Sequence, residues 1–380
     1  MIRYGKHFID SKDRKAVIDV LKSNWLTQGP LVDSFESSLK KFFKSKYCCV
    51  VSNGTAALHL AGMALGWKKN DVILFSPISF VSASNVAIHL GARPDFVDIN
   101  KKTYNIDTEK LKKKIKVYKL KNKKIKAIVA TDYAGNPCNW SELRKISRDF
   151  KIQLVNDNCH ALGAVYKKDN CYSLKYADVV TQSFHPVKNI TTAEGGAVLT
   201  NNKTIYNQVK ILRTHGIIKK NHPWFYEMKF LGLNYRLSDI QCALGISQLK
   251  KIKKFIKRRN EIAKVYNRFF SDNLFIKTPN ISESNRHAYH LYPLLIDFKK
   301  IKLNKLQFFK ELKKKNIFLQ VHYIPIHLQP YYKKKFKFKK GDFPNAENFY
   351  EQEVSIPMFY DLKKKQQYKV IKNILKLINQ

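Results

Sequence analysis

Residues 183–196 read SFHPVKNITTAEGG and surround one lysine with a proline, small hydroxyl residues and paired glycines. Other lysines stand in runs such as residues 333–335, so Lys188 is set apart. A strand predicted over residues 177–184 leads to Lys188, and the apolar residues 196–200 follow it. A rigid, desolvated turn lowers the pKa of a lysine and leaves its amine neutral for attack on a carbonyl. The alternative is a lysine that extends from a strand end into water.

An acidic residue upstream is a suitable partner for this lysine. Residues 152–155 form a short apolar strand, and Asp157 follows it. Open α/β sheets bind ligands at the carboxyl ends of their strands, so Asp157 and Lys188 are expected to face one crevice. A carboxylate on a pyridinium nitrogen, with a Schiff-base lysine, is the arrangement that pyridoxal 5′-phosphate (PLP) requires. Taken alone, Asp157 could equally be a helix N-cap.

A PLP site also needs a place for the phosphate. The turn SNGT, residues 52–55, follows a predicted strand and precedes a helical run. Gly54 permits close approach of the backbone, the first amides of the helix attract an anion, and Thr55 adds a hydroxyl. Ser183 is a further phosphate candidate, and Phe80 could stack on the pyridine ring. The alternatives are an ordinary capped strand–helix joint and a core phenylalanine.

The central part of the chain alternates short apolar strands with helical stretches. Such alternation predicts an α/β fold with a mainly parallel central sheet flanked by helices. After the strand before residue 52, the predicted strands cover residues 72–75, 94–97, 125–131, 152–155, 179–184 and 196–200.

The length of 380 residues is enough for two domains. We expect a large PLP-binding domain over residues 1–247 and a smaller C-terminal α+β domain over residues 248–380. A long helix from residue 238 to about 270 is predicted to join them. The N-terminal helix within residues 1–23 is predicted to pack on the small domain, and the lysine-rich residues 333–340 to form a loop.

Several motifs along nearly the whole chain resemble those of the DegT/StrS-type sugar aminotransferases, which are fold-type I PLP enzymes. The resemblance implies a transaminase and a homodimer with shared active sites. The motifs are WLTQGP at 25–30, HPVK at 185–188, WFYEM at 224–228, NYR at 234–236, VHYIP at 321–325 and QPYY at 329–332.

The resemblance implies a role for each matching residue. Lys188 matches the lysine that holds the cofactor and moves the proton, Asp157 the partner of the pyridine nitrogen, and His160 the neighbour of the cofactor's phenolic oxygen. Gly54, Thr55 and Ser183 match phosphate-binding residues, and Asn234 an asparagine that reaches the phosphate from the other subunit. The segments that line the sugar-nucleotide pocket in relatives contain Thr27, His322 and Tyr323.

Within the family the chain is most similar to the branch that serves pseudaminic acid biosynthesis. The expected reaction moves an amino group from glutamate to C4 of a UDP-linked 4-keto-6-deoxy sugar, UDP-2-acetamido-2,6-dideoxy-β-L-arabino-hexos-4-ulose. Asn189 and Ala193 depart from that branch, which usually has proline and glycine there, and resemble the aminoarabinose branch, so UDP-4-keto-arabinose is the alternative substrate. A PLP lyase or dehydratase is a further alternative, although dehydratase relatives carry histidine in place of Lys188.

A net charge of +42 raises the remote alternative of a non-catalytic nucleic-acid-binding protein. Lysine far outnumbers arginine here, whereas readers of nucleic acid favour arginine. The lysines are therefore expected on a solvated surface, and no specific nucleic acid is expected as a partner. Six cysteines without CxxC spacing predict neither zinc nor a redox pair and favour a reduced cytoplasm. No apolar stretch approaches about 20 residues, so no membrane partner is expected.

Overall fold

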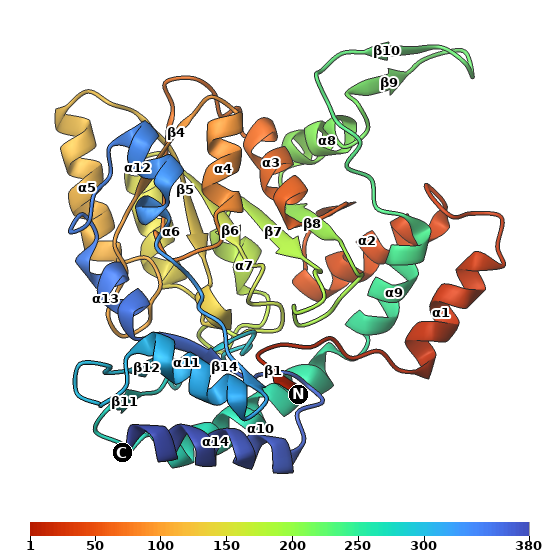
Figure 1. Ribbon diagram of the computed structural model, residues 1–380. Coiled ribbons are helices and arrows are strands. Elements are labelled where there is room, and N and C mark those ends of the chain that lie inside the picture. The colour runs from red at the N-terminus through yellow and green to blue at the C-terminus, as the bar shows by residue number, and fades with distance from the viewer. Residues whose placement is uncertain (380) are drawn as a thin grey trace.

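A seven-stranded sheet lies at the centre of the computed structural model, which describes residues 1–379 (Figure 1). Its strand order is β2-β8-β7-β6-β5-β3-β4, and β8 alone runs antiparallel to its two neighbours. The predicted mainly parallel sheet is confirmed. The strands are β2 (Tyr47–Val51), β3 (Val72–Phe75), β4 (Arg93–Phe96), β5 (Ile125–Thr131), β6 (Gln153–Asp157), β7 (Val179–Ser183) and β8 (Gly196–Thr200).

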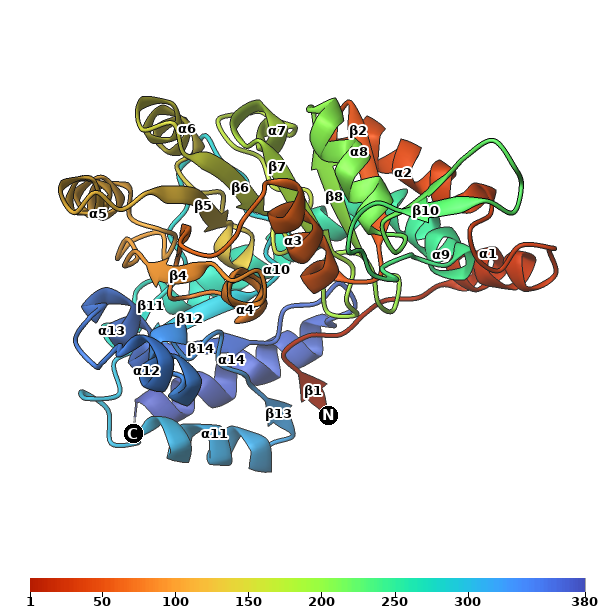
Figure 2. The same ribbon diagram turned by 90° about the horizontal axis from the view of Figure 1, so that it is seen from above.

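The central strands are apolar on both faces because helices cover both faces (Figure 2). Side chains alternate between two hydrophobic clusters: Leu74 and Leu154 belong to one, Ile73 and Val155 to the other. On the first face lie α2 (Pro30–Phe43), α5 (Thr108–Leu120), α6 (Trp140–Asp149) and α7 (Tyr172–Tyr176). On the second lie α3 (Gly54–Ala64), α4 (Ser82–His89) and α8 (Lys203–Leu212).

A third hydrophobic cluster forms around a small antiparallel sheet near the C-terminus. Its strands are β11 (Ile276–Lys277), β12 (Tyr292–Ile296) and β14 (Glu353–Ile356), and it packs with α10 (Ile252–Phe270), α11 (Lys305–Lys314) and α14 (Lys364–Ile378). The first strand, β1 (Ile2–Arg3), pairs in parallel with β13 (Ile317–Phe318), so the chain start joins this region.

The predicted long helix over residues 238–270 is wrong. The structure has α9 (Asp239–Leu249) and α10, separated at Lys250 and Lys251. The turn there is tightened, since the Lys251 N–H donates to the Gln248 carbonyl oxygen three residues back. Tertiary contacts hold it: the Lys251 ammonium binds Asp13 and Asp10. The division at residue 247 remains a prediction, and α9 spans it.

The predicted loop over residues 333–340 is also partly wrong. Helix α12 (Pro330–Phe336) covers its first part, with the proline at its first turn and a left-handed Lys337 at its end. The Tyr332 side chain is buried and its hydroxyl donates to Asn85 at 2.7 Å. Helix α12 and α13 (Pro344–Gln352) follow the short helix η2 (Ile326–Leu328) and pack beside β4, where Tyr332 and Phe343 contact Phe96.

The N-terminal helix α1 (Ser11–Leu21) lies along α9. Asp10 caps it and forms a capping box with Asp13. The predicted packing of this helix on the small domain remains a prediction, because the main partner of α1 is α9. The contacts with the C-terminal region come from the residues before the helix: β1 pairs with β13, and the Phe8 ring packs on Phe255 and Tyr360.

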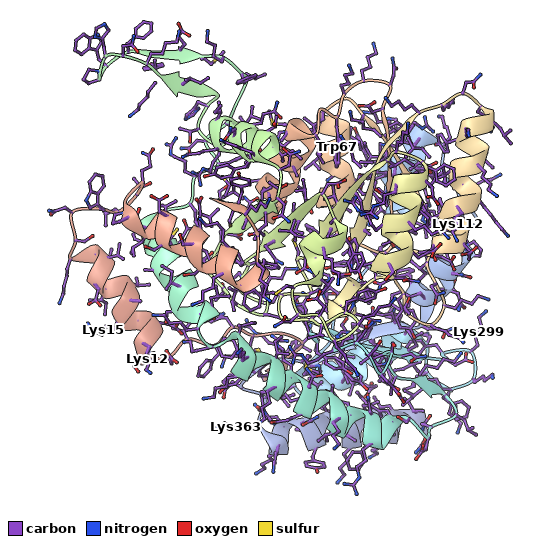
Figure 3. The ribbon with its side chains drawn as sticks, turned by 180° about the vertical axis from the view of Figure 1, so that it is seen from behind. Lys12, Lys15, Trp67, Lys112, Lys299 and Lys363 are labelled. Atoms are coloured by element: carbon purple, nitrogen blue, oxygen red, sulfur yellow. The ribbon has the colours of Figure 1, made fainter. Side chains whose placement is uncertain are left out.

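Lysines extend from many elements into solvent, as Lys12, Lys15, Lys299 and Lys363 show in Figure 3. Their spread over several helices and loops fits the expectation of a solvated, charged surface. Within residues 1–379, none of the helices is long and apolar enough to cross a bilayer.

One buried ion pair fixes the N-terminal segment. Asp13 is fully buried and accepts hydrogen bonds from Ser247 Oγ at 2.6 Å, Gln248 Nε2 at 2.7 Å and Lys251 Nζ at 2.6 Å. A buried carboxylate that loses its cation keeps its desolvation cost, so this pair matters more than an exposed one.

Lys251→Met should lower the free energy of unfolding by roughly 1–3 kcal/mol, because Asp13 would keep its neutral donors but lose its counter-ion. Urea unfolding followed by circular dichroism measures this, with exposed Lys253→Met as the matched control. Equal stability of the two variants would contradict a structural role for the pair.

Candidate active site

Lys188 lies in the loop between β7 and β8, where it is partly buried. Its backbone N–H donates to the His185 carbonyl oxygen at 2.9 Å, and Thr192 closes the loop by donating from its N–H to the Phe184 carbonyl oxygen at 3.0 Å. Burial lowers the pKa of the Lys188 amine, while Cys159 and Asp157 partly offset that effect. The loop thus holds an amine that loses its proton more readily than a surface lysine.

Asp157 is the last residue of β6, which lies next to β7 in the sheet. Its carboxylate accepts from Thr131 Oγ1 at 3.3 Å and from the Cys159 N–H at 3.2 Å. The next helix, α7, begins only at Tyr172, so Asp157 caps no helix and the N-cap alternative is wrong. The ends of two parallel neighbours therefore deliver a carboxylate and a lysine to one side of the sheet.

Helix α3 begins beside the end of β7. Asn53 caps it by accepting from the Ala56 N–H at 2.8 Å, and Gly54 and Thr55 are its first residues. A Cβ on Gly54 would lie 2.8 Å from the Ser183 Cβ, closer than side chains normally approach. Glycine is therefore needed for the helix N-terminus to reach Ser183, and the three phosphate candidates converge there.

The side chains of His160 and Tyr323 contact each other. The Ala134 N–H donates to His160 Nδ1 at 3.2 Å, and His160 Nε2 lies 3.1 Å from the Tyr323 hydroxyl oxygen. Because Nδ1 accepts, the neutral ring carries its proton on Nε2 and donates to Tyr323. Burial, together with the Lys188 charge, holds the pKa of His160 well below its usual value. The phenol of Tyr323 keeps its own proton free to donate.

Ser355 and Glu353 hold His322 in place. Ser355 Oγ donates to Glu353 at 2.5 Å and lies 2.8 Å from His322 Nδ1, while the His322 N–H donates to the other Glu353 oxygen at 2.9 Å. Ser355 must therefore accept from His322 Nδ1–H, which leaves Nε2 as a bare acceptor. Burial is the main cause that lowers the pKa of His322, to about 3.

Sequence reasoning missed His290, to which no motif gave a role. Its Nε2 lies 3.5 Å from Lys188 Nζ, and its ring centroid lies 4.4 Å from that of His160. The signal available was three histidines among residues 287–290 and 322 in a chain with only 11. The hydrogen bonds of Glu353 and Ser355 to His322 were also missed, because nothing in a β-strand sequence shows which buried polar groups meet.

The other predicted residues lie farther out. Phe80 is 58% exposed, and its ring centroid lies 6.0 Å from that of Tyr323, so it stands at the margin of the cluster. Thr27 and Asn234 are exposed; Thr27 bridges Ser238, and Asn234 bridges Thr214. No hydrogen bond in residues 1–379 brings Thr27 or Asn234 to Lys188 within one protomer.

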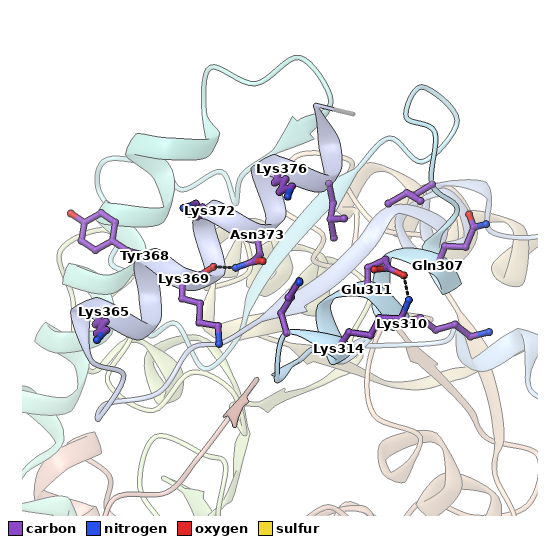
Figure 4. Close-up of a pocket in the computed structure, with 13 residues that line it drawn as sticks. Gln307, Lys310, Glu311, Lys314, Lys365, Tyr368, Lys369, Lys372, Asn373 and Lys376 are labelled. Carbon is purple, nitrogen blue, oxygen red and sulfur yellow. Dashed lines mark hydrogen bonds and ion pairs between the residues drawn. The ribbon is translucent and has the colours of Figure 1, made fainter.

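A wide groove of about 850 Å³ lies elsewhere, between α11 and α14 (Figure 4). Its lining is mostly basic, and its one acid, Glu311, pairs with Lys314 at 2.6 Å. No histidine lines it, so it has positive charge but no buried acid–base cluster. The lysines are Lys310, Lys314, Lys315, Lys365, Lys369, Lys372 and Lys376.

The chain is similar to known sugar aminotransferases along nearly its whole length. The DegT/DnrJ/EryC1/StrS aminotransferase family model matches residues 7–375. The chain is 40% identical over 363 residues to the UDP-4-amino-4,6-dideoxy-N-acetyl-β-L-altrosamine transaminase of Campylobacter jejuni strain 81-176, covering 95% of this chain and 93% of the relative. Helicobacter pylori PseC, an aminotransferase of pseudoaminic acid biosynthesis, superposes with a TM-score of 0.91 at 34% identity, covering 100% of this chain and 99% of its own. Spr1654 of Streptococcus pneumoniae in its PMP form gives a TM-score of 0.91 at 27% identity, covering 100% of this chain and 99% of its own.

The chain belongs to the DegT/DnrJ/EryC1/StrS aminotransferase family. It is a PLP-dependent sugar aminotransferase with the fold of that class, and the predictions of fold, enzyme class and cofactor are confirmed. The residues present fit the cofactor: a carboxylate ends β6, a lysine lies in the loop after the adjacent β7, and Gly54 lets the start of α3 approach Ser183. No group of three His, Cys, Asp or Glu side chains that could hold a metal ion occurs within residues 1–379.

The low pKa of His322 predicts a pH-dependent stability. Between its unfolded pKa near 6.5 and its folded pKa of about 3, the unfolded state binds more protons, so the wild type loses stability as pH falls. Compared with His322→Asn, whose amide can still bond Ser355, the wild type should lose up to about 1.4 kcal/mol per pH unit below pH 6.5. Urea unfolding at pH 7.5, 6.5, 5.5 and 4.5 measures the difference. A difference independent of pH would contradict the burial of a neutral His322.

Proposed function

We propose that the enzyme takes its amino group from glutamate and transfers it to C4 of UDP-2-acetamido-2,6-dideoxy-β-L-arabino-hexos-4-ulose. The observation that carries the chemistry is that Asp157 ends β6 and Lys188 lies in the loop that follows its parallel neighbour β7. The sugar is supported by the Campylobacter jejuni relative, which is 40% identical over 95% of this chain.

The chain's own residues have separable tasks. PLP, when bound, supplies the electron sink that stabilises the carbanion of the amino donor. Asp157 holds the pyridine nitrogen protonated, and Lys188 Nζ takes up and returns the proton in each half-reaction. The depressed pKa of Lys188 suits this task, because a base that moves a proton both ways works best near the ambient pH. Gly54, Thr55 and Ser183 hold the phosphate through the start of α3.

His160, His322 and Tyr323 offer defined hydrogen-bond donors and acceptors to the sugar nucleotide. His160 donates to Tyr323, so the Tyr323 hydroxyl offers its proton outward. With PLP bound, His160 would be the neighbour of its phenolic oxygen that the resemblance implies. His322 offers a bare Nε2, held by Ser355 and Glu353. A hydroxyl of the sugar nucleotide can accept from Tyr323 and donate to His322, with Phe80 at the margin. Thr27 remains a predicted pocket residue.

The two departures from the pseudaminic branch do not favour UDP-4-keto-arabinose. Asn189 is buried, and its amide donates to the Leu162 carbonyl oxygen at 2.9 Å, within the protein core. Ala193 takes a left-handed backbone with φ of 66°, and its N–H donates to Thr191 Oγ1 at 3.0 Å. Both residues serve the fold of the Lys188 loop, which accounts for them without reference to the sugar.

We also propose a homodimer in which each active site uses both subunits. The antiparallel hairpin of β9 (Ile217–Lys219) and β10 (Tyr226–Met228) projects from the body of the protomer (Figure 1). Its tip and return carry exposed apolar side chains, a surface that a second copy would bury. Asn234 follows this arm directly. The exposed residues are Trp224, Phe225, Tyr226, Met228, Phe230, Leu231 and Leu233.

We place the enzyme in the cytoplasm. All six cysteines are free thiols, and four of them, including Cys48 and Cys49, are buried. Buried unpaired thiols are usual in a reducing compartment. Glutamate and UDP-sugars are the partners expected there.

Lys188→Ala should abolish transamination while the fold and Tm stay close to those of the wild type, because the amine takes part in chemistry and bonds only weakly to the protein. Turnover is measured as 2-oxoglutarate released from glutamate with the UDP-4-keto sugar, and exposed Lys203→Ala is the matched control. Retained turnover in Lys188→Ala would overturn the assignment of the lysine.

A shared active site predicts complementation between two inactive variants. Lys188→Ala and Asn234→Ala should each be inactive, and their mixed refolding should restore about a quarter of wild-type activity, since half of the dimers are mixed and each has one intact site. Turnover that never rises above that of the separate variants would contradict a site built from both subunits.

A further inference from the structure

His290 stands next to the reacting amine without any assigned task. Among residues 1–379, the structure gives Lys188 Nζ one hydrogen-bond partner, His290 Nε2 at 3.5 Å. The imidazole is 4% exposed, and its other nitrogen, Nδ1, is buried without a hydrogen-bond partner. A buried nitrogen that bonds nothing is costly, which is unusual for a residue with a merely structural role.

The surrounding residues hold this ring in place. The buried Arg259 guanidinium donates to the carbonyl oxygens of Tyr289 at 2.8 Å, His290 at 3.3 Å and Met358 at 3.0 Å, which clamps the backbone on either side of the imidazole. The His160 ring packs against one face of His290 at 4.4 Å between centroids. The position of Nε2 is therefore set by the fold and not by Lys188.

The protonation states of His290 and Lys188 decide which of the two side chains donates the hydrogen bond between them. Burial and the neighbouring cations lower the pKa of His290 well below its usual value, so the imidazole is neutral at neutral pH. A neutral imidazole nitrogen can accept from an ammonium but does not compete with it for the proton. The charged or titratable groups that face His290 and Lys188 are Asp157 at the end of β6, Cys159 just after it, His160, His322 and Arg259.

We propose that His290 is the acceptor that receives and orients the Lys188 amine whenever that amine is free, and that its Nε2 stabilises the ammonium form. No bond is made or broken by His290; the proton stays on Lys188 and is held in a fixed direction until it is returned. This inference rests on the proposed function for its catalytic meaning. The pairing itself is a property of the protein without cofactor.

The test measures the proton affinity of Lys188 in the apoenzyme. Competitive acetylation with acetic anhydride across pH 6 to 11, read by mass spectrometry of the peptide that holds Lys188, gives its titration. In His290→Leu the profile should move to lower pH, because the ammonium loses its acceptor. His290→Gln, whose amide reaches the place of Nε2, should restore a profile near that of the wild type.

The matched control is His287→Gln. His287 is also buried and neutral, with a pKa lowered to about 3 by burial, and it lies on the same segment, but its Nδ1 accepts from the Tyr289 N–H. Its variant should leave the Lys188 profile unchanged. If His290→Leu does not fold, His290→Asn, whose amide is too short to reach Lys188, takes its place and should show the same shift.

A second readout links the pairing to catalysis. The rate of the glutamate half-reaction should fall about tenfold or more in His290→Leu, as expected for loss of a hydrogen bond to a charged group, with partial recovery in His290→Gln. An acetylation profile of His290→Leu or His290→Asn identical to that of the wild type would overturn the inference. Turnover retained by Lys188→Ala would instead overturn the proposed function. The acetylation profiles would still test the pairing of His290 with Lys188, because they are measured without cofactor.

Discussion

The parallel pairing of β6 with β7 is the constraint on which the rest of the site depends. It sets Asp157 and the loop of Lys188 at the same edge of the sheet, and the antiparallel return of β8 closes that loop. Gly54 then lets the start of α3 approach the end of β7. The strands β6, β7 and β8 are buried on both faces, so the core fixes the positions of the acid, of the Lys188 loop and of the helix end proposed to bind the phosphate.

The central sheet could be predicted closely from sequence because each strand is a short apolar run between turn residues; β3, β5 and β8 have the predicted bounds. Lys188, Asp157, Gly54 and Ser183 could be proposed as candidates because strand ends, glycines and isolated charges are local signals. The break between α9 and α10 could not be found, since the bonds that hold it come from Asp10 and Asp13, far away in the chain. For the same reason His290 and the Glu353–Ser355–His322 contacts were missed: buried polar groups find their partners through tertiary packing.

The lysines that give the net charge and the residues of the candidate active site lie in different parts of the molecule. The lysines that give the net charge of +42 extend into solvent from many helices, and the groove between α11 and α14 gathers seven of them without a histidine. The buried site instead holds one lysine among neutral histidines and a carboxylate. A positive surface raises the local concentration of a diphosphate-bearing substrate by steering. Selectivity for the reaction comes from the buried groups, whose protonation the low-dielectric surroundings control.

The most direct test of the account is the visible absorption spectrum of the purified enzyme with PLP, before and after addition of glutamate. The account predicts a yellow band that disappears with glutamate and returns with 2-oxoglutarate, because the proposed function assigns cofactor binding and proton transfer to Lys188 and Asp157. A protein that forms no band with added PLP, or whose band no amino donor changes, would contradict it.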